Sequence, residues 1–238
     1  MVLQDCSLQP GFPLTRQRHS VPKAAPRVAL PSKFRLGALA LRAMVRAVIV
    51  PGNGCNNVRS SNWYGWLEKR LLKDGRFSEV VVKDMPDPLD AKRSIWLPFM
   101  LATLGCDAST VIIGHSSGAV AAMRLLEEHE LAGALLVSAC HTDLGSASER
   151  AAGYYPPSGG PWQWDAMQRN SGGNICVLHS DDDPFIPLRE AEHVAKSLAV
   201  QLRMEPGRSH FFEPGEDIVQ AAYALLERAE ATQAAAAE

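Results

Sequence analysis

The 238-residue sequence lacks several features that would assign it to a particular class of protein. It has no apolar run near the ~18–20 residues that a membrane-spanning helix needs. Its formal net charge is only −2, so its composition gives no sign of a nucleic-acid or other polyanionic partner. With 46% hydrophobic and 21% charged residues, it has the composition of an ordinary soluble globular protein. We therefore expect no nucleic-acid partner and no membrane partner.

Paired cysteines are also lacking. The five cysteines are scattered singly, at positions 6, 55, 106, 140 and 176, and no CxxC pair occurs. This argues against zinc-ribbon and thioredoxin-type sites. An odd, dispersed set is typical of reduced, mostly buried thiols in an intracellular protein. We expect no metal ion and no cofactor, and a location inside the cell, most simply the cytoplasm.

Acidic residues are scarce at the N-terminus. Residues 1–45 contain seven Lys or Arg, five prolines and one acid, Asp5. Basic, acid-poor composition is typical of an organelle transit peptide, which would direct the protein to a mitochondrion or plastid. A disordered arm, or a misassigned start with translation beginning at Met44, explains the segment equally well. In each case we expect residues 1–45 to lie outside the folded domain.

The rest of the chain alternates between short apolar runs and amphipathic segments. We expect a single domain over residues 46–230, followed by a tail at 231–238. The sequence predicts strands at 46–50, 78–83, 109–113, 132–138, 174–179 and 200–204, and helices at 62–73, 90–104, 117–128, 188–198 and 215–229. Pro98 is expected to kink the second of these helices or to divide it in two. This alternation indicates an α/β fold whose mostly parallel sheet is covered by helices on both faces.

Residues 141–172 interrupt this alternation and are rich in Gly, Pro and aromatics. A long insertion of this kind is usually a functional lid or a disordered loop, and its aromatic residues make a simple linker the weaker interpretation. Two of them, Trp162 and Trp164, together with Trp63 and Tyr64, are candidates for the wall of an apolar substrate pocket. Packing in the core or under the lid explains these four side chains equally well.

The stretch TVIIGHSSGAV at 110–120 fits the pattern G-x-S-x-G. In this pattern a strand turns sharply into a helix, and the central serine is held in a strained conformation above the sheet edge. Only Ser116 has a glycine two residues away on each side, Gly114 and Gly118. Ser116 is therefore the candidate nucleophile, and Ser117 is expected to contribute its backbone N–H.

A serine hydroxyl needs a base, and the base needs an orienting partner. Where a serine is presented by such a turn, the acid and the histidine follow it in that order, each after a late strand. We select Asp183 from SDDDPFIP at 180–187, because it lies farthest into the loop; Asp181 and Asp182 are expected to cap the turn or to face solvent. His210 is the only later histidine in a loop after a strand. His115 is expected to pack or hydrogen-bond locally.

Stabilising an oxyanion requires two fixed N–H donors. We expect one to be the backbone of Ser117. The other should come from PGNG at 51–54, the loop after the first strand, with Asn53 as the first choice and Gly54 as the second.

Several segments together resemble the retinoblastoma-binding protein nine group of small serine hydrolases, within the α/β-hydrolase superfamily. They are AVIVPGNG, NWYGW, MPDP, SIWLPFM, IIGHSSGA, LVSA, PWQW, DDPFIP and RSHF, and the resemblance extends from about residue 46 to residue 225. The resemblance implies a three-layer α/β-hydrolase-like fold with a minimal lid, and a triad of Ser116, Asp183 and His210. It also implies activity on amino-acid esters or on small amide or peptide-like substrates.

The chain departs from that group at two points. The LxCxE motif that docks on the retinoblastoma pocket is here LGCDA at 104–108, whose last residue is alanine, which puts such binding in doubt. The residue before the histidine is usually glycine, and here it is Ser209. We expect this change to be tolerated if the backbone there avoids positive φ.

The sequence thus predicts a serine hydrolase that cleaves small ester or amide substrates through an acyl-enzyme. A peptidase or an acyltransferase using the same triad is the nearest alternative. A partner-binding protein on a hydrolase fold is the alternative from another class. A dinucleotide-binding domain is disfavoured, because PGNG lacks the G-x-G-x-x-G spacing.

Overall fold

The computed structural model describes residues 45–236 of the chain. The predicted basic extension at 1–45 and the start at Met44 thus lie almost entirely outside the described residues, as do the last two residues of the predicted tail. Within residues 45–236, no helix is long and apolar enough to cross a bilayer.

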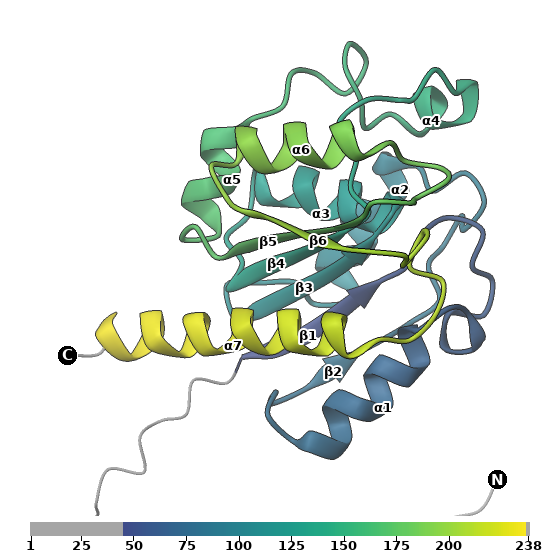
Figure 1. Cartoon of the computed structure of the whole chain (residues 1–238). Coiled ribbons are helices and arrows are strands. Elements are labelled where there is room, and N and C mark those ends of the chain that lie inside the picture. Colours follow the sequence, from purple (N-terminus) through teal and green to yellow (C-terminus); the bar gives the residue numbers. More distant parts are fainter. Residues whose placement is uncertain (1–44, 237–238) are drawn as a thin grey trace, which may run out of the picture. The chain divides into compact units, whose positions relative to one another are not determined.

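A six-stranded sheet forms the centre of the described part (Figure 1), and every neighbouring pair of strands is parallel. The strand order is β2-β1-β3-β4-β5-β6. The strands are β1 (Arg46–Val50), β2 (Val80–Val81), β3 (Thr110–His115), β4 (Gly133–Val137), β5 (Ile175–Ser180) and β6 (Leu202–Glu205). The chain moves outward from β1 to β2 and then returns to the other side of β1, so the order reverses between β1 and β3. Loops that follow the strands at such a point are where ligands of open α/β sheets bind.

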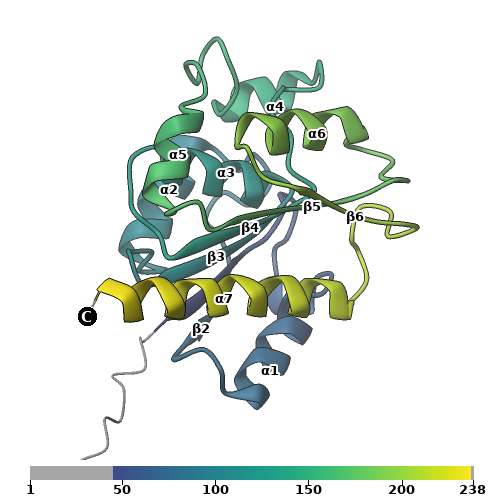
Figure 2. The same cartoon turned by 60° about the vertical axis from the view of Figure 1, so that its left-hand side comes forward.

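Helices cover both faces of the sheet, as the turned view in Figure 2 also shows. One core cluster packs α1 (Tyr64–Asp74) and α7 (Glu216–Ala236) against the sheet. The opposite cluster contains α2 (Arg93–Ala102), α3 (Ser117–Leu126), α5 (Trp164–Asn170) and α6 (Leu188–Ser197). The short elements η1 (Val58–Ser60) and α4 (Ala147–Ala152) lie in loops. The predicted three-layer α/β-hydrolase-like fold is confirmed.

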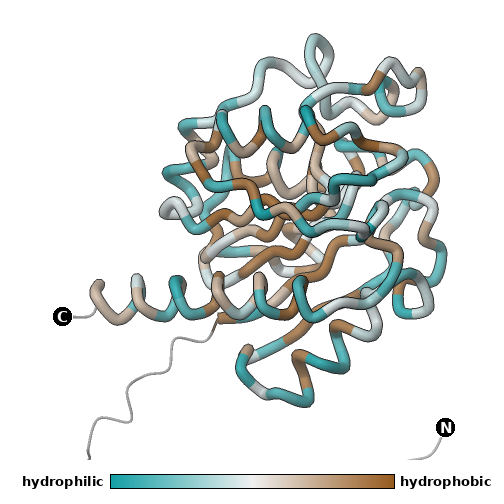
Figure 3. Tube along the Cα trace, in the orientation of Figure 1, coloured by the Kyte–Doolittle hydropathy of each residue, from teal (hydrophilic) through white to brown (hydrophobic). Residues whose placement is uncertain are grey.

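Successive strand residues alternate between the two clusters. In β1, Val48 and Val50 pack on the α3 side, whereas Ala47 and Ile49 pack on the α7 side. All four are fully buried. Because both faces are covered, β1 is apolar at every position from Ala47 to Val50 rather than at every second one. Figure 3 shows the strands as the hydrophobic centre between helices that carry hydrophilic stretches.

Several predicted boundaries differ from those observed. The strand predicted at 78–83 is reduced to Val80–Val81. Pro98 does not divide the helix predicted at 90–104; it lies inside one helix, α2. The carbonyl that it leaves without a helical N–H belongs to the exposed Ser94, where water can satisfy it. The last helix continues to Ala236, well into the predicted tail, because its final residues are mostly alanine.

The insertion at 141–172 is ordered and contains α4 and α5. Arg124 of α3 attaches it to the domain: its guanidinium donates to the carbonyls of Tyr154 and Gly160 and stacks 3.7 Å from the ring centre of Trp162. The interpretation of this segment as a disordered loop was therefore wrong.

Candidate active site

The turn at Ser116 joins the last residue of β3 directly to the first residue of α3. Ser116 has φ 54° and ψ −120°, a strained conformation for a residue with a side chain. Both flanking glycines are required by close packing. A Cβ on Gly114 would lie 2.5 Å from the carbonyl oxygen of Gly118, and one on Gly118 would lie 2.4 Å from that of Val50. The sequence therefore folds into a turn that projects the Ser116 hydroxyl beyond the sheet.

A cavity of about 280 Å³ lies at this turn. Ser116 and His210 both line it, and so do residues from the loop after β1 and from the insertion. Within the described residues the Ser116 hydroxyl makes no hydrogen bond. Contacts between nucleophile and base are often loose when no substrate is bound, and they tighten in the reacting complex.

The carboxylate of Asp183 is fully buried and accepts four hydrogen bonds. Oδ1 accepts the backbone N–H groups of Phe185 and Ile186, at 2.9 and 3.0 Å. Oδ2 accepts from Ser138 Oγ at 2.9 Å and from His210 Nδ1 at 2.8 Å. Burial alone would raise the pKa of Asp183, but the bonds from His210 and the two N–H groups outweigh it and lower the pKa. The group is therefore an ionised acceptor.

Because Asp183 can only accept, Nδ1 of His210 carries a proton. In the neutral imidazole, Nε2 is then the unprotonated nitrogen. Nε2 makes no hydrogen bond within the described residues, and His210 lines the cavity. The imidazole is thus held in the tautomer that a general base requires.

The loop that carries His210 is attached to the end of β5 by successive hydrogen bonds. Ser180 Oγ accepts the N–H of Arg208, at 2.8 Å. Asp181 accepts from Gly207 at 2.9 Å, and Asp182 accepts from Ser209 at 2.7 Å. The two aspartates predicted to cap a turn or to face solvent are exposed, and they also align the histidine loop with Asp183.

The condition placed on Ser209 is not met, since its φ is 50°. Phe211, on the other side of His210, has the same φ. Each such residue costs roughly 1–2 kcal/mol relative to an ordinary conformation. The bond from Ser209 to Asp182 helps to hold the strained backbone in place.

Two backbone N–H groups of the loop at 51–54 already have acceptors. Gly52 donates to the hydroxyl of Tyr64 at 3.0 Å, and Gly54 donates to the carbonyl of Pro88 at 2.7 Å. Gly54 was therefore a wrong second choice of oxyanion donor. The N–H of Asn53 has no acceptor among the described residues, and Asn53 lines the cavity. The N–H of Ser117, at the start of α3, has none either, because the first turn of a helix leaves such donors unpaired.

Of the four aromatic residues expected at the pocket, only Tyr64 lines this cavity. Trp63 is fully buried and donates to the carbonyl of Phe211 at 2.8 Å. Trp162 and Trp164 stack on each other at 5.5 Å, on the side of the insertion held by Arg124. The insertion instead contributes Tyr155 to the cavity. The sequence places these aromatic residues on helices and in the insertion, but it does not determine which way each side chain points.

The family model described as "Serine hydrolase" matches residues 47–222, which include every side chain of this site. The chain belongs to the serine hydrolase family. The resemblance to the retinoblastoma-binding protein nine group is also confirmed. Serine hydrolase RBBP9 of Rattus norvegicus is 48% identical over 166 residues, covering 70% of this chain and 87% of that protein.

A more distant relative is similar both in sequence and in structure. YdeN of Bacillus subtilis (strain 168) is 26% identical over 65% of this chain and 80% of its own length. The crystal structure of the B. subtilis ydeN gene product superposes with a TM-score of 0.63 at 23% identity, covering 76% of this chain and 99% of that one. The structural likeness supports the fold assignment of this serine hydrolase.

The LGCDA segment of this serine hydrolase is not presented as a docking peptide. Leu104 is 1% exposed and Cys106 is 5% exposed, both within the core cluster next to α3. A partner could not reach either side chain unless the segment left the domain. The structure thus adds a second reason, besides the missing acid, against binding of the retinoblastoma type.

Sequence reasoning missed several polar residues of the site. Ser138 contacts Asp183, and Asn62, Glu149 and Tyr155 line the cavity. Ser138 directly follows β4, so the rule that placed Asp183 after β5 would also have found it. Glu149 follows Ser146 by three residues, and this spacing predicts a helix cap rather than a cavity residue.

Proposed function

We propose that this serine hydrolase cleaves small esters or amides through a covalent acyl-enzyme formed on Ser116. The observation that carries the proposal is the 2.8 Å contact between Asp183 and His210, whose imidazole lines the same cavity as the strained Ser116. The chain order of serine, aspartate and histidine is the order that this fold uses for acyl transfer.

In the proposed reaction, Ser116 Oγ attacks the substrate carbonyl carbon while its proton passes to Nε2 of His210. The tetrahedral intermediate collapses, the bond to the leaving group breaks, and His210 returns the proton to that group. Water then attacks the acyl-enzyme with His210 again acting as base, which releases the acid and restores Ser116. Asp183 stabilises the imidazolium in each half-reaction without taking the proton.

The negative charge that develops on the carbonyl oxygen needs donors that are already in place. The unpaired N–H groups of Asn53 and Ser117 supply them in this proposal. Removing one such donor typically costs about 3–4 kcal/mol in the barrier. Both are backbone groups, so substitution of the side chains leaves them present.

The cavity favours small substrates, because about 280 Å³ is near the lower limit of the ~300–1,000 Å³ found for small-molecule sites. Glu149 supports the narrower class of amino-acid esters. It lines the cavity, and Tyr155 donates to its Oε2 at 3.2 Å. Burial raises the pKa of Glu149, because it disfavours the charged carboxylate. A positively charged ammonium group beside the carboxylate would stabilise the charged form and offset this effect. We propose that the α-ammonium of an amino-acid ester binds there.

Turnover of p-nitrophenyl esters tests this function. The wild-type protein should release p-nitrophenol, Ser116→Ala should not exceed the buffer rate, and Ser117→Ala should still turn over because its backbone N–H remains. A wild type that binds esters without turnover would support the non-catalytic, partner-binding alternative instead.

We also propose a reducing compartment. The four cysteines in the described part of the chain, Cys55, Cys106, Cys140 and Cys176, are all free thiols. Such thiols persist where disulfides do not form.

A further inference from the structure

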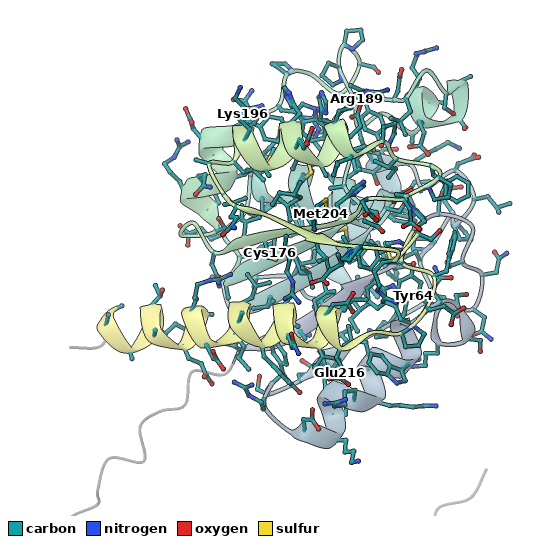
Figure 4. All side chains as sticks on the ribbon, viewed as in Figure 1. Tyr64, Cys176, Arg189, Lys196, Met204 and Glu216 are labelled. Carbon is teal, nitrogen blue, oxygen red and sulfur yellow. The ribbon has the colours of Figure 1, made fainter. Side chains whose placement is uncertain are left out.

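Two buried side chains in the cavity wall take no part in the acyl transfer itself. Tyr64 is fully buried and His115 is 1% exposed. They come from different elements, since Tyr64 begins α1 and His115 ends β3. Figure 4 labels Tyr64 at the end of α1 nearest the loops that follow the strands. Their polar atoms lie 2.6 Å apart, Tyr64 Oη to His115 Nδ1.

The positions of the protons in this pair follow from their neighbours. Nε2 of His115 lies 2.9 Å from the carbonyl oxygen of His210, which can only accept, so Nε2 carries a proton. In a neutral imidazole Nδ1 then accepts, and Tyr64 must donate to it. The hydroxyl of Tyr64 also accepts from the N–H of Gly52 at 3.0 Å and from Nδ2 of Asn62 at 3.2 Å. The hydrogen bonds therefore form one continuous series, in which Gly52 donates to Tyr64, Tyr64 to His115, and His115 to the carbonyl of His210.

His115 must stay neutral for this arrangement to persist. Burial, helped by the neighbouring His210, lowers its pKa to about 3. Burial also raises the pKa of Tyr64, so its hydroxyl keeps its proton. Near neutral pH the chain of bonds from Gly52 to His210 is thus unbroken.

This chain of bonds joins parts of the site that are far apart in the sequence. Tyr64 and His115 are 51 residues apart, and His115 and His210 are 95 apart. One end holds Gly52, which precedes the proposed oxyanion donor Asn53. The other end holds the backbone of His210 itself.

The backbone at His210 needs such support. Ser209 and Phe211 both have φ 50°, so the loop is strained on each side of the histidine. Acceptors at the end of β5 hold its N–H groups, as described above. Two donors hold its carbonyls: His115 bonds that of His210, and Trp63 bonds that of Phe211. Removing the His115 donor would leave the carbonyl of His210 buried without its partner.

We propose that Tyr64 and His115 are positioning residues that fix the His210 backbone and the loop at 51–54 relative to Ser116. This inference rests on the proposed function, because it concerns the same site. The ring centres of His115 and His210 lie 4.8 Å apart, so the two imidazoles are in contact and a displacement of one shifts the other. Neither positioning residue needs to touch substrate for the effect.

Two substitutions at position 115 separate the two hydrogen bonds of His115, one with Tyr64 and one with the carbonyl of His210. His115→Gln places an amide N–H near the position of Nε2, so it keeps the donor to His210. His115→Asn places an amide near the position of Nδ1, so it keeps a partner for Tyr64 and loses the donor. We expect kcat to stay within about threefold of wild type in His115→Gln and to fall at least tenfold in His115→Asn, while KM changes less than twofold in both.

Substitutions of tyrosine provide the matched control. His115→Gln loses the bond from Tyr64 but leaves the Tyr64 hydroxyl as acceptor for Gly52. Tyr64→Phe removes that acceptor as well, next to the proposed oxyanion donor Asn53, and its kcat should therefore fall about tenfold. Tyr154 is equally buried, does not line the cavity, and its hydroxyl has no hydrogen-bond partner among the described residues. Tyr154→Phe should therefore keep the wild-type kcat.

The concentration of active sites is measured by fluorophosphonate titration, so that kcat reports only folded, labelled protein. Equal kcat values in His115→Gln and His115→Asn, or a wild-type kcat in Tyr64→Phe, would overturn the positioning role. A wild type that neither takes up the probe nor turns over ester would instead overturn the proposed function. The two failures are thus distinguishable.

Discussion

Ser138 Oγ donates a hydrogen bond of 2.9 Å to Asp183 Oδ2, the same oxygen that accepts from His210. Ser138 is fully buried and has φ 49°, so the end of β4 is strained where it reaches the carboxylate. Ser138 and His210 therefore bond the same carboxylate oxygen, and Ser138 helps to orient the Asp183 carboxylate toward His210.

Ser138→Ala should lower kcat/KM about tenfold, because a hydrogen bond to a charged group contributes roughly 1.5–3 kcal/mol and part of that orients Asp183. Steady-state kinetics on a p-nitrophenyl ester measure this. Ser171→Ala is the control, since its buried hydroxyl bonds the carbonyl of Met167 in α5, outside the cavity. An unchanged kcat/KM in Ser138→Ala would show that the extra donor is dispensable.

The low pKa of His115 predicts how stability depends on pH. An unfolded histidine binds its proton near pH 6.5, whereas folded His115 does so only near pH 3. Between these values the unfolded state holds more protons, so stability falls as the pH is lowered, by about 1.4 kcal/mol per unit. In His115→Gln this contribution is absent.

Urea unfolding at pH 7 and pH 5 checks the prediction. The wild type should lose about 2 kcal/mol more than His115→Gln over that interval. The lowered pKa values of Asp183 and His179 act in the same direction but are common to both proteins. Parallel losses in the two proteins would contradict the assignment of a buried, neutral His115.

The packing of the turn at Ser116 against the chain at Val50 and Pro51 predicts that Gly118→Ala disturbs both segments. The new Cβ would lie 2.4 Å from the carbonyl oxygen of Val50 and 2.5 Å from that of Pro51, so the backbone there must move. Overpacking of this kind costs about 1–3 kcal/mol. We expect a lower midpoint in thermal unfolding and a larger fall in kcat than in KM. A Gly118→Ala variant as stable as the wild type would contradict this prediction, because it would show that the backbone at Val50 and Pro51 moves without loss of stability.

The position of Glu149 predicts a preference for substrates that carry an ammonium group. Glu149→Gln should lower kcat/KM at least tenfold for the p-nitrophenyl ester of L-valine, and less than twofold for that of 3-methylbutanoate, which has the same shape without the amine. Glu192→Gln, an exposed residue of α6, is the matched control. Equal effects on both esters would exclude Glu149 as the site of the ammonium.

The features of this site that could be predicted were those encoded by neighbouring residues. The turn at Ser116 follows from two glycines at fixed spacing between a β-branched run and an alanine-rich helix. Asp183 and His210 follow from their places after late strands. The apolar runs predicted the parallel sheet, because strands buried on both faces leave a continuous pattern.

What could not be predicted depends on contacts between distant segments. The position of Ser138 after β4 could have marked it as a site residue, but no local pattern shows that its hydroxyl bonds Asp183, 45 residues away. Gly54 was a reasonable donor until the carbonyl of Pro88 was found to occupy its N–H. Trp63 and Tyr64 are adjacent in the chain, yet only the packing of α1 decides that the tyrosine lines the cavity and the tryptophan does not. The positive φ of Ser209 likewise arises from bonds to another loop.

Covalent labelling by a fluorophosphonate tests the central claim, that Ser116 is the nucleophile of this serine hydrolase. Intact mass spectrometry should show one adduct per wild-type chain, and peptide mapping should place it on Ser116. Ser116→Ala should remain unlabelled under the same conditions, whereas Ser117→Ala should still be labelled. A wild type that takes up no probe, or an adduct that persists in Ser116→Ala, would contradict the account.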